Sequence, residues 1–189
     1  MNGESAEESG EGLRAADGGG RARVRVALLL AAAVVVWVLL QGMGIHERLP
    51  ERIPVHFGPG GRPDGWAGKS YLSAFGLLIA AAGMLLLMAF VSRLSAKWYN
   101  FPGKERVLRL PPEQQAYVIA PMQEALAWLG AAIGVGFSLA CRQTWQVALG
   151  ERAGISAALM FVPLGVGLAG VVVSILVTRA RLRSLEEPA

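Results

Sequence analysis

Four long apolar stretches dominate this chain, and none of them carries a charged side chain near its middle. They are Val26–Ile45, Tyr71–Val91, Ala125–Cys141 and Ile155–Val177. A helix rises about 1.5 Å per residue, so roughly 20 apolar residues cross a hydrocarbon core about 30 Å thick. The stretches therefore predict four transmembrane helices, of which the third is near the short limit.

The composition agrees with an all-α membrane protein, because 53% of the 189 residues are hydrophobic and most of these lie in the four stretches. Small residues within them, such as Gly130 with Gly134 and the glycines of the run Gly165–Gly170, let helices approach closely in lipid. We expect them to serve packing inside one four-transmembrane-helix bundle, with homodimerisation as the second interpretation. The single cysteine, Cys141, is expected to be a packing residue rather than a reactive thiol.

The basic residues predict how the helices are oriented. Twelve of the 18 Lys and Arg residues lie on one side of the predicted membrane: Arg14, Arg21, Arg23, Arg25, Arg93, Lys97, Lys104, Arg106, Arg109, Arg179, Arg181 and Arg183. Basic residues in short loops stay in the cytoplasm, so both termini and the loop 92–124 are predicted to be cytoplasmic. These charges sit where anchors that flank the spans belong. The lipid bilayer is therefore the expected partner, and nucleic acid is not.

The ends of the chain differ from its apolar middle. Residues 1–22 mix Glu, Ser and Gly with almost no large apolar residue, which predicts a disordered cytoplasmic tail. The first span is too long for a cleaved signal peptide, so a retained signal anchor is expected. We predict five segments: the tail 1–22, a first helix pair with its outer loop at 23–95, a cytoplasmic interfacial loop and short helix at 96–124, a second helix pair at 125–180, and a cytoplasmic tail at 181–189.

The loop between the first two spans is rich in proline and glycine. Ile53–Phe57 is predicted to be extended, because a residue before proline is pushed toward β or polyproline geometry. Gly58–Gly61 and Pro63–Gly65 are typical of turns, with Pro63 presetting a corner. The loop therefore predicts a short turn-rich extracytoplasmic hairpin between helices 1 and 2.

This loop also carries a recognisable pattern, Leu-Pro-x-x-Ile-Pro-x-His-Phe followed by Gly-x-Pro-Asp-Gly-x-x-x-Lys. The matching residues are Leu49, Pro50, Ile53, Pro54, His56, Phe57, Gly61, Pro63, Asp64, Gly65 and Lys69. The pattern resembles the bacterial family called domain of unknown function 1648, and Tyr99–Glu113 resembles the segment that follows in four-span members. A relative that carries such a domain, the sporulation-delay toxin immunity protein, protects against a peptide toxin and holds a transcriptional repressor at the membrane. The resemblance implies a bacterial cytoplasmic membrane protein, with an extracytoplasmic peptide ligand or a cytoplasmic regulator as its partner.

The candidate ligand-binding or structural residues of the outer loop are Pro54, His56, Phe57, Pro63, Asp64, Gly65 and Lys69. His56 and Asp64 can ligate a metal or exchange a proton, but two ligands are too few for a closed zinc site. His46, Glu47 or Glu51 would have to join them. The alternative is structural, with Asp64 accepting backbone N–H groups of the turn and His56 hydrogen-bonded beside Phe57. We predict no metal, no cofactor and no catalytic residue, and we expect Lys69 to be solvated or to contact lipid headgroups.

The loop 92–124 has two predicted parts. Lys97–Phe101 mixes aromatic residues with a cation, as is typical of the headgroup level. Leu110–Glu113 resembles the start of a helix, and Pro121 is expected to kink or interrupt that helix before the third span. A lipid-interface anchor is the preferred interpretation, and a docking surface for a cytoplasmic partner is the alternative.

The sequence leads to three hypotheses about function. The first is a non-enzymatic integral membrane protein, a sensor, accessory or peptide-immunity factor that acts through its outer loop. The second is a small transporter component, although the span centres lack the charged residues that proton-driven transporters carry. The third is a metal-dependent membrane enzyme that uses His56 and Asp64.

Overall fold

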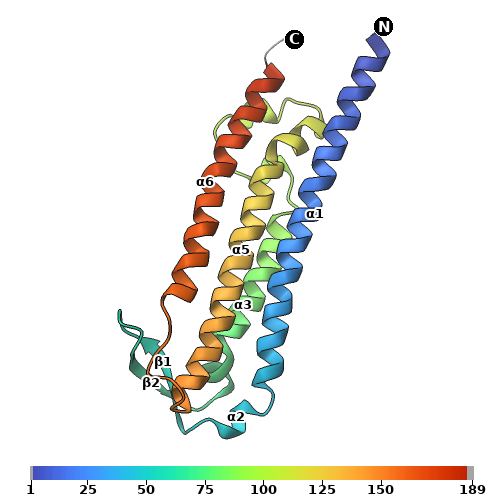
Figure 1. The fold of residues 1–189 in the computed structure, drawn as a ribbon. Coiled ribbons are helices and arrows are strands. Elements are labelled where there is room, and N and C mark those ends of the chain that lie inside the picture. Colours follow the sequence, from blue (N-terminus) through green and yellow to red (C-terminus); the bar gives the residue numbers. More distant parts are fainter. Residues whose placement is uncertain (1, 187–189) are drawn as a thin grey trace.

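The computed structural model describes residues 2–186, with side chains for residues 18–159 and 161–185. Four long helices lie side by side: α1 (Asn2–Gly42), α3 (Tyr71–Val91), α5 (Pro112–Ala148) and α6 (Ala158–Glu186) (Figure 1). The shorter elements are α2 (Ile45–Arg48), β1 (Arg52–Phe57), β2 (Pro63–Gly68), the 3-10 helix η1 (Ala96–Trp98) and α4 (Lys104–Val107). Each long helix contains a span apolar and long enough to cross a membrane. The predicted all-α membrane bundle with a hairpin between its first two spans is confirmed.

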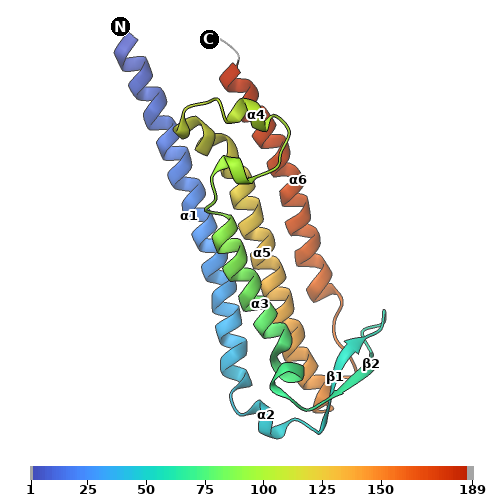
Figure 2. The same ribbon diagram turned by 180° about the vertical axis from the view of Figure 1, so that it is seen from behind.

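The bundle has two distinct ends. Both termini lie at one end, together with η1 and α4, as both views show (Figures 1 and 2). We call this the terminal end. The hairpin of β1 and β2, helix α2 and the loop between α5 and α6 lie at the other, which we call the hairpin end. The chain therefore crosses the bundle four times and returns to the end where it began.

Helix α5 is the centre of the bundle, because α1, α3 and α6 all pack against it. Gly130 and Gly134 of α5 face Met88 and Leu85 of α3, which confirms their predicted role in packing inside one chain. Within the run Gly165–Gly170 the predicted packing role is confirmed for Gly167, which lies against Leu129 of α5. The space around Gly165 and Gly170 is open, so the prediction is wrong for these two glycines.

Cys141 is buried in the same bundle core. Its thiol donates to the Ala74 carbonyl at 3.4 Å, so the predicted packing role is confirmed. A groove of about 700 Å³ between α1, α5 and α6 is lined mainly by apolar residues, including Val34 and Val166.

The segment 2–22 differs from the predicted disordered tail, since α1 begins at Asn2 and runs without a break into the first span. Glu and Ala are frequent in this segment and are good helix formers, whereas its six glycines disfavour a helix. Extending an existing helix also avoids the unfavourable nucleation step. The composition shows correctly that the segment has no apolar core of its own. It does not show that the adjacent span provides a helix that the segment can extend.

Helix α5 differs most from its prediction, because it covers 37 residues rather than the expected span Ala125–Cys141. It begins at Pro112, as predicted from Leu110–Glu113, and Pro121 lies inside it without interrupting it. The turns before Pro121 are inclined to the rest of the helix (Figure 1). Proline cannot donate to the carbonyl four residues earlier, which here belongs to Tyr117. Arg181 of α6 donates to that carbonyl at 2.7 Å and so replaces the missing helical hydrogen bond.

The segment between α3 and α5 packs into the terminal end rather than lying on it. Tyr99 and Phe101 are buried with Val107 and Leu182 in one apolar core. The Tyr99 hydroxyl donates to the Val91 carbonyl at 2.5 Å, and burial raises the pKa of Tyr99 while a hydrogen bond with Gln123 opposes the shift. The predicted lipid-interface anchor is therefore wrong for these two aromatic residues.

Candidate functional site

The hairpin at the candidate site is a two-stranded antiparallel sheet. Ile53 and Pro54 at the start of β1 are fully buried against the bundle, and Ile53 pairs with Ala67. The register shifts on both sides of His56, which marks a bulge. Such shifts bend a strand and re-aim its side chains. The bulge therefore lets the outer half of the hairpin direct the His56 side chain independently of the inner half. Ile53 and Pro54 of the inner half stay buried in the core.

His56 and Asp64 lie side by side on this outer half. His56 Nδ1 and Asp64 Oδ1 are 2.5 Å apart, and both side chains are more than half exposed. Asp64 was predicted to accept from turn backbone groups, but its carboxylate faces the imidazole instead. Gly65 makes the pairing possible, because it is opposite His56 and an added Cβ would lie 2.8 Å from the His56 Cβ.

The hairpin turn is formed by Gly58–Gly61, in which the Gly61 N–H donates to the Gly58 carbonyl at 2.8 Å. This part of the prediction is confirmed. The turn predicted for Pro63–Gly65 is wrong, because these residues form strand β2, where Pro63 pairs with Phe57. A proline is tolerated as the first residue of a strand.

The tip of the hairpin is joined to the loop before α6. The Ile155 N–H donates to the Gly61 carbonyl at 2.8 Å, and Gly154 and Gly61 approach so closely that a Cβ on either would overlap the other segment's backbone. On the other side of this loop, the buried Gln143 side chain of α5 accepts from the Ser156 N–H at 2.7 Å. Hydrogen bonds therefore link the hairpin and α5 to the loop that leads into α6.

Lys69 fastens the base of the hairpin. Its ammonium group donates to the carbonyl of Leu49 at 2.8 Å and lies 3.4 Å from that of Glu47, both at the C-terminal end of α2. A cation is favourable there, because the unpaired carbonyls of a helix end carry partial negative charge. The expectation that Lys69 is solvated or contacts lipid is therefore wrong, and its role in this structure is positional.

The other residues considered as metal ligands do not approach His56. His46 instead stacks on Tyr71, with ring centroids 4.3 Å apart, and Tyr71 is followed by Phe75 and Trp145 in a row of aromatic rings. Among the described residues, no three His, Cys, Asp or Glu side chains gather in a way that could hold a metal ion. The arrangement around His56 offers one imidazole and one carboxylate.

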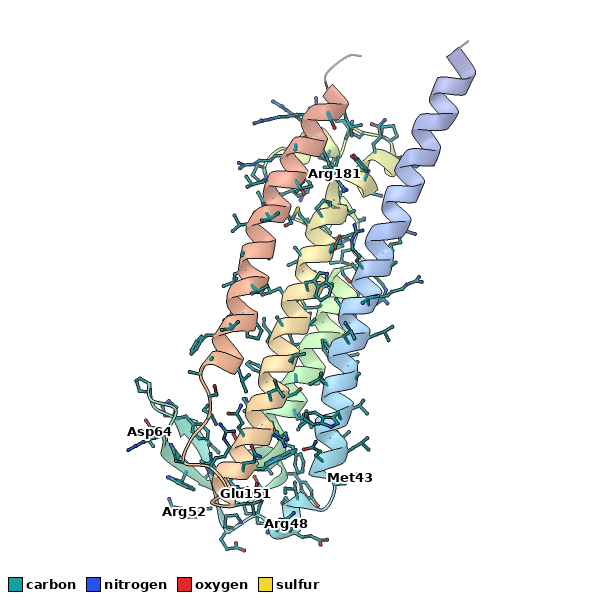
Figure 3. The ribbon with its side chains drawn as sticks, in the orientation of Figure 1. Met43, Arg48, Arg52, Asp64, Glu151 and Arg181 are labelled. Atoms are coloured by element: carbon teal, nitrogen blue, oxygen red, sulfur yellow. The ribbon has the colours of Figure 1, made fainter. Side chains whose placement is uncertain are left out.

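A groove of about 740 Å³ lies between the hairpin, α3, the end of α5 and the start of α6. Pro54, Phe57, Leu72 and Phe161 give it apolar walls, and His56 and Asp64 are part of its lining. Asp64 is its only carboxylate, and the lining contains neither Lys nor Arg. Figure 3 shows Asp64 on the hairpin, and Arg48, Arg52 and Glu151 at the same end of the bundle. We call this space the hairpin groove.

Sequence reasoning placed His56, Phe57 and Asp64 at one site, and the structure brings them together. It missed the contribution of α5, of the loop before α6 and of α6 itself, from which Thr144, Ile155 and Phe161 line the groove. No local signal could have found these residues, because they reach the hairpin only through the packing of the helices.

Comparison with known families bears on the same part of the chain. Residues 26–82 match the model of a family described as a domain of unknown function (DUF1648). Residues 26–82 are a DUF1648 domain. The match covers the first span, the hairpin and the first half of α3, and it confirms the family resemblance expected from the loop pattern. Comparison with curated proteins found no match, and comparison with solved structures found none either.

The link between the DUF1648 hairpin and α6 can be tested at Gly61, whose φ of 72° is in the left-handed region. Replacing Gly61 with alanine should strain the turn by roughly 1 kcal/mol and force the Ile155 backbone away. We expect hydrogen exchange of the Ile155 amide to accelerate about tenfold. Gly60→Ala is the control, because the space around Gly60 is open. Equal acceleration in both variants would contradict the proposed linkage.

Proposed function

We propose that the chain is a non-enzymatic protein of the bacterial cytoplasmic membrane that binds an extracytoplasmic ligand of peptide type in the hairpin groove. The observation that carries the proposal is the groove itself, an apolar space that one His–Asp pair borders. Both termini would lie in the cytoplasm and the hairpin outside. The distribution of Lys and Arg supports this orientation, since twelve of the 18 belong to the terminal end and its flanking segments.

The lining of the groove indicates the class of ligand. Apolar walls favour apolar side chains, and a single exposed carboxylate without a competing cation favours a basic group beside it. A short peptide with Leu-like side chains and one or more amines has both features. A lipid tail alone would leave the His56–Asp64 pair unused.

The His–Asp pair supports recognition more than catalysis. A carboxylate at Nδ1 fixes the ring and leaves Nε2 to face a ligand. Nucleophilic catalysis would need a hydroxyl or thiol within hydrogen-bond reach of the imidazole. Among the described side chains, no such group is hydrogen-bonded to His56, and the nearby Ser73 hydroxyl is used in capping α3.

A bound ligand could be reported to the other side of the membrane through α6. The groove lies between the hairpin and the first turn of α6, and the Gly61–Ile155 hydrogen bond joins the hairpin to the loop directly before α6. The far end of α6 is packed into the terminal-end core by Leu182. Occupancy of the groove that shifts the start of α6 would therefore reach the surface where a cytoplasmic regulator could bind.

The proposal predicts that the purified full chain binds a basic apolar peptide. As a probe we suggest a fluorescent 12-residue peptide of alternating Lys and Leu, measured by anisotropy in detergent micelles. Asp64→Ala removes the carboxylate of the pair, and a charged hydrogen bond contributes about 1.5 kcal/mol or more. We expect the affinity to fall about tenfold.

Arg62→Ala is the matched control, because Arg62 is an exposed hairpin residue outside the groove lining. The control should bind the peptide at least as well as the wild type. A Glu/Leu peptide of the same length should bind more weakly than the Lys/Leu peptide. Equal binding of the two peptides, or equal losses in Asp64→Ala and Arg62→Ala, would rule out the groove as the recognition site.

A further inference from the structure

A third cavity lies at the terminal end, at the opposite end of the bundle from the hairpin groove. It has a volume of about 490 Å³ and is bounded by the first turns of the α1 span, the end of α3 with the residues that follow it, and the start of α5. Three arginines line it, namely Arg21, Arg25 and Arg93, and no Asp or Glu is among the described residues of its lining. We call it the arginine cavity.

Helix geometry explains why only some arginines of α1 reach this cavity. Arg21 and Arg25 are four residues apart, so they share one face of the helix. Arg23 lies between them in sequence and on another face, where its guanidinium pairs with Glu124 of α5 at 2.7 Å. Arg23 is thus neutralised within the bundle, whereas Arg25 has no hydrogen-bond or ion-pair partner among the described residues.

Arg93 reaches the cavity from the opposite wall. One of its terminal nitrogens donates to the Ala89 carbonyl at 2.6 Å, which orients the guanidinium and leaves its other N–H groups for a ligand. The wall around it is fixed, because the Gln123 side chain of α5 donates to the Leu94 carbonyl at 3.0 Å. The positive charge of the cavity therefore comes from two separate segments, α1 and the residues that follow α3. The Gln123–Leu94 hydrogen bond and the packing of the bundle hold them in place.

The rest of the lining shows what kind of anion would fit. Val24, Leu28 and Ile119 give the cavity an apolar wall on the side of the bundle. Residues 18–42 and 71–91 are spans, so the cavity lies at the level where lipid headgroups meet the hydrocarbon. Arginine forks match the oxygens of phosphate esters in geometry as well as charge. An anion that carries an apolar group could bind the arginines through its charge and contact the apolar wall through that group.

We propose that the arginine cavity binds the phosphate ester of an anionic phospholipid, with Arg25 and Arg93 holding the phosphate. Arginines that merely flank a span contact headgroups all around the protein. Here they converge on one concave site whose described lining includes no acidic residue, and this favours a resident lipid over a general attraction. Lipid binding in the arginine cavity does not depend on ligand binding in the hairpin groove, so one can be absent while the other is present.

The test measures retention of defined lipids by the full chain in native mass spectrometry. The probes are phosphatidylglycerol, phosphatidylcholine and, as a soluble source of the same chemistry, inorganic phosphate. The cavity variant is R25Q/R93Q. The matched control is R48Q/R52Q, which removes the same charge from two exposed residues at the hairpin end (Figure 3).

We expect the wild type and R48Q/R52Q to retain phosphatidylglycerol in preference to phosphatidylcholine, and R25Q/R93Q to lose at least 80% of the bound phosphatidylglycerol, about a fivefold change. R25K/R93K keeps the charge and should keep part of the binding, which guards against a folding defect. Displacement by millimolar inorganic phosphate in the wild type alone would support the phosphate site and assign it to a soluble ligand. Equal losses in both glutamine variants, or no loss in either, would overturn the proposal.

Discussion

Replacing Trp145 with alanine should lower the free energy of unfolding by about 4 kcal/mol, the largest loss that we expect from a single truncation in this protein. Trp145 is 3% exposed and joins elements that are distant in sequence. Its ring packs edge-on against Phe75 of α3 at 5.4 Å, and a Cβ on Gly42 of α1 would lie 2.7 Å from it. Its indole N–H donates to the Ala74 carbonyl at 2.6 Å. The same core includes Ile53 of the hairpin.

The physical reason for this loss is packing rather than simple transfer from water. Lipid is as apolar as the core, so a helix residue in a membrane gains little from burial alone. Removing the indole instead leaves a void and forfeits its van der Waals contacts. Because these contacts join α1, α3, α5 and the hairpin, we expect the hairpin to loosen along with the bundle.

The measurement is equilibrium unfolding of the full chain in mixed micelles with increasing dodecyl sulfate, followed by circular dichroism. Trp145→Phe keeps most of the ring volume and removes the N–H donor, so it should cost about 1 to 2 kcal/mol. Trp128→Ala is the control in the same helix, because Trp128 is 43% exposed beside the groove between α1 and α6. A loss in Trp128→Ala that matches that in Trp145→Ala would refute the assigned core.

Hydropathy predicted the number of spans and the boundaries of α3 because the bilayer itself sets them. The Tyr71–Val91 stretch is apolar from end to end, so its helix and its span coincide. Helix α5 shows why the agreement stops there. Backbone hydrogen bonding continues through polar residues at both ends, such as Gln115 and Arg142, where hydropathy falls. A helix boundary is set by capping and packing, which an average over apolar residues does not detect.

Pro121 illustrates a second limit of the sequence. Its local rule, the loss of a backbone donor, predicts a helix that is kinked or interrupted. The Tyr117 carbonyl that it leaves unpaired accepts from Arg181, which lies 64 positions after Tyr117 in sequence and points from α6 toward α5 (Figure 3). The Arg181 guanidinium also lies 4.4 Å from the centroid of the Tyr117 ring. Only the tertiary structure reveals that the helix can continue.

The candidate site was predictable in part. The loop pattern placed His56 and Asp64 on one hairpin, and turn chemistry located its tip at Gly58–Gly61. Their direct pairing depends on the strand register and its bulges, which single residues do not determine. The arginine cavity had one local signal, the four-residue spacing of Arg21 and Arg25. Its third arginine, Arg93, follows the end of α3, and its approach to the other two depends on the fold.

Replacing Gly130 with leucine should destabilise the bundle by about 3 kcal/mol. A Cβ at Gly130 would overlap the Cβ and Cγ atoms of Met88, so α3 and α5 would have to separate. The overlap includes the first side-chain carbon, which cannot swing aside as the end of a methionine can. Gly83→Leu in α3 is the control, since nothing lies within 4 Å of that position. It should have little effect or a small gain, because leucine favours helix more than glycine does.

A second variant distinguishes packing within one chain from packing between two copies. If Met88 is the obstacle, Met88→Ala should restore much of the stability of Gly130→Leu, so the two substitutions should be strongly non-additive. Dodecyl sulfate unfolding of the single and double variants measures this coupling, and light scattering in micelles gives the oligomeric state. If Gly130 instead served a homodimer, Gly130→Leu would dissociate it and Met88→Ala would restore nothing. We expect rescue without a change in oligomeric state, because Gly130 and Gly134 both face α3 of the same chain.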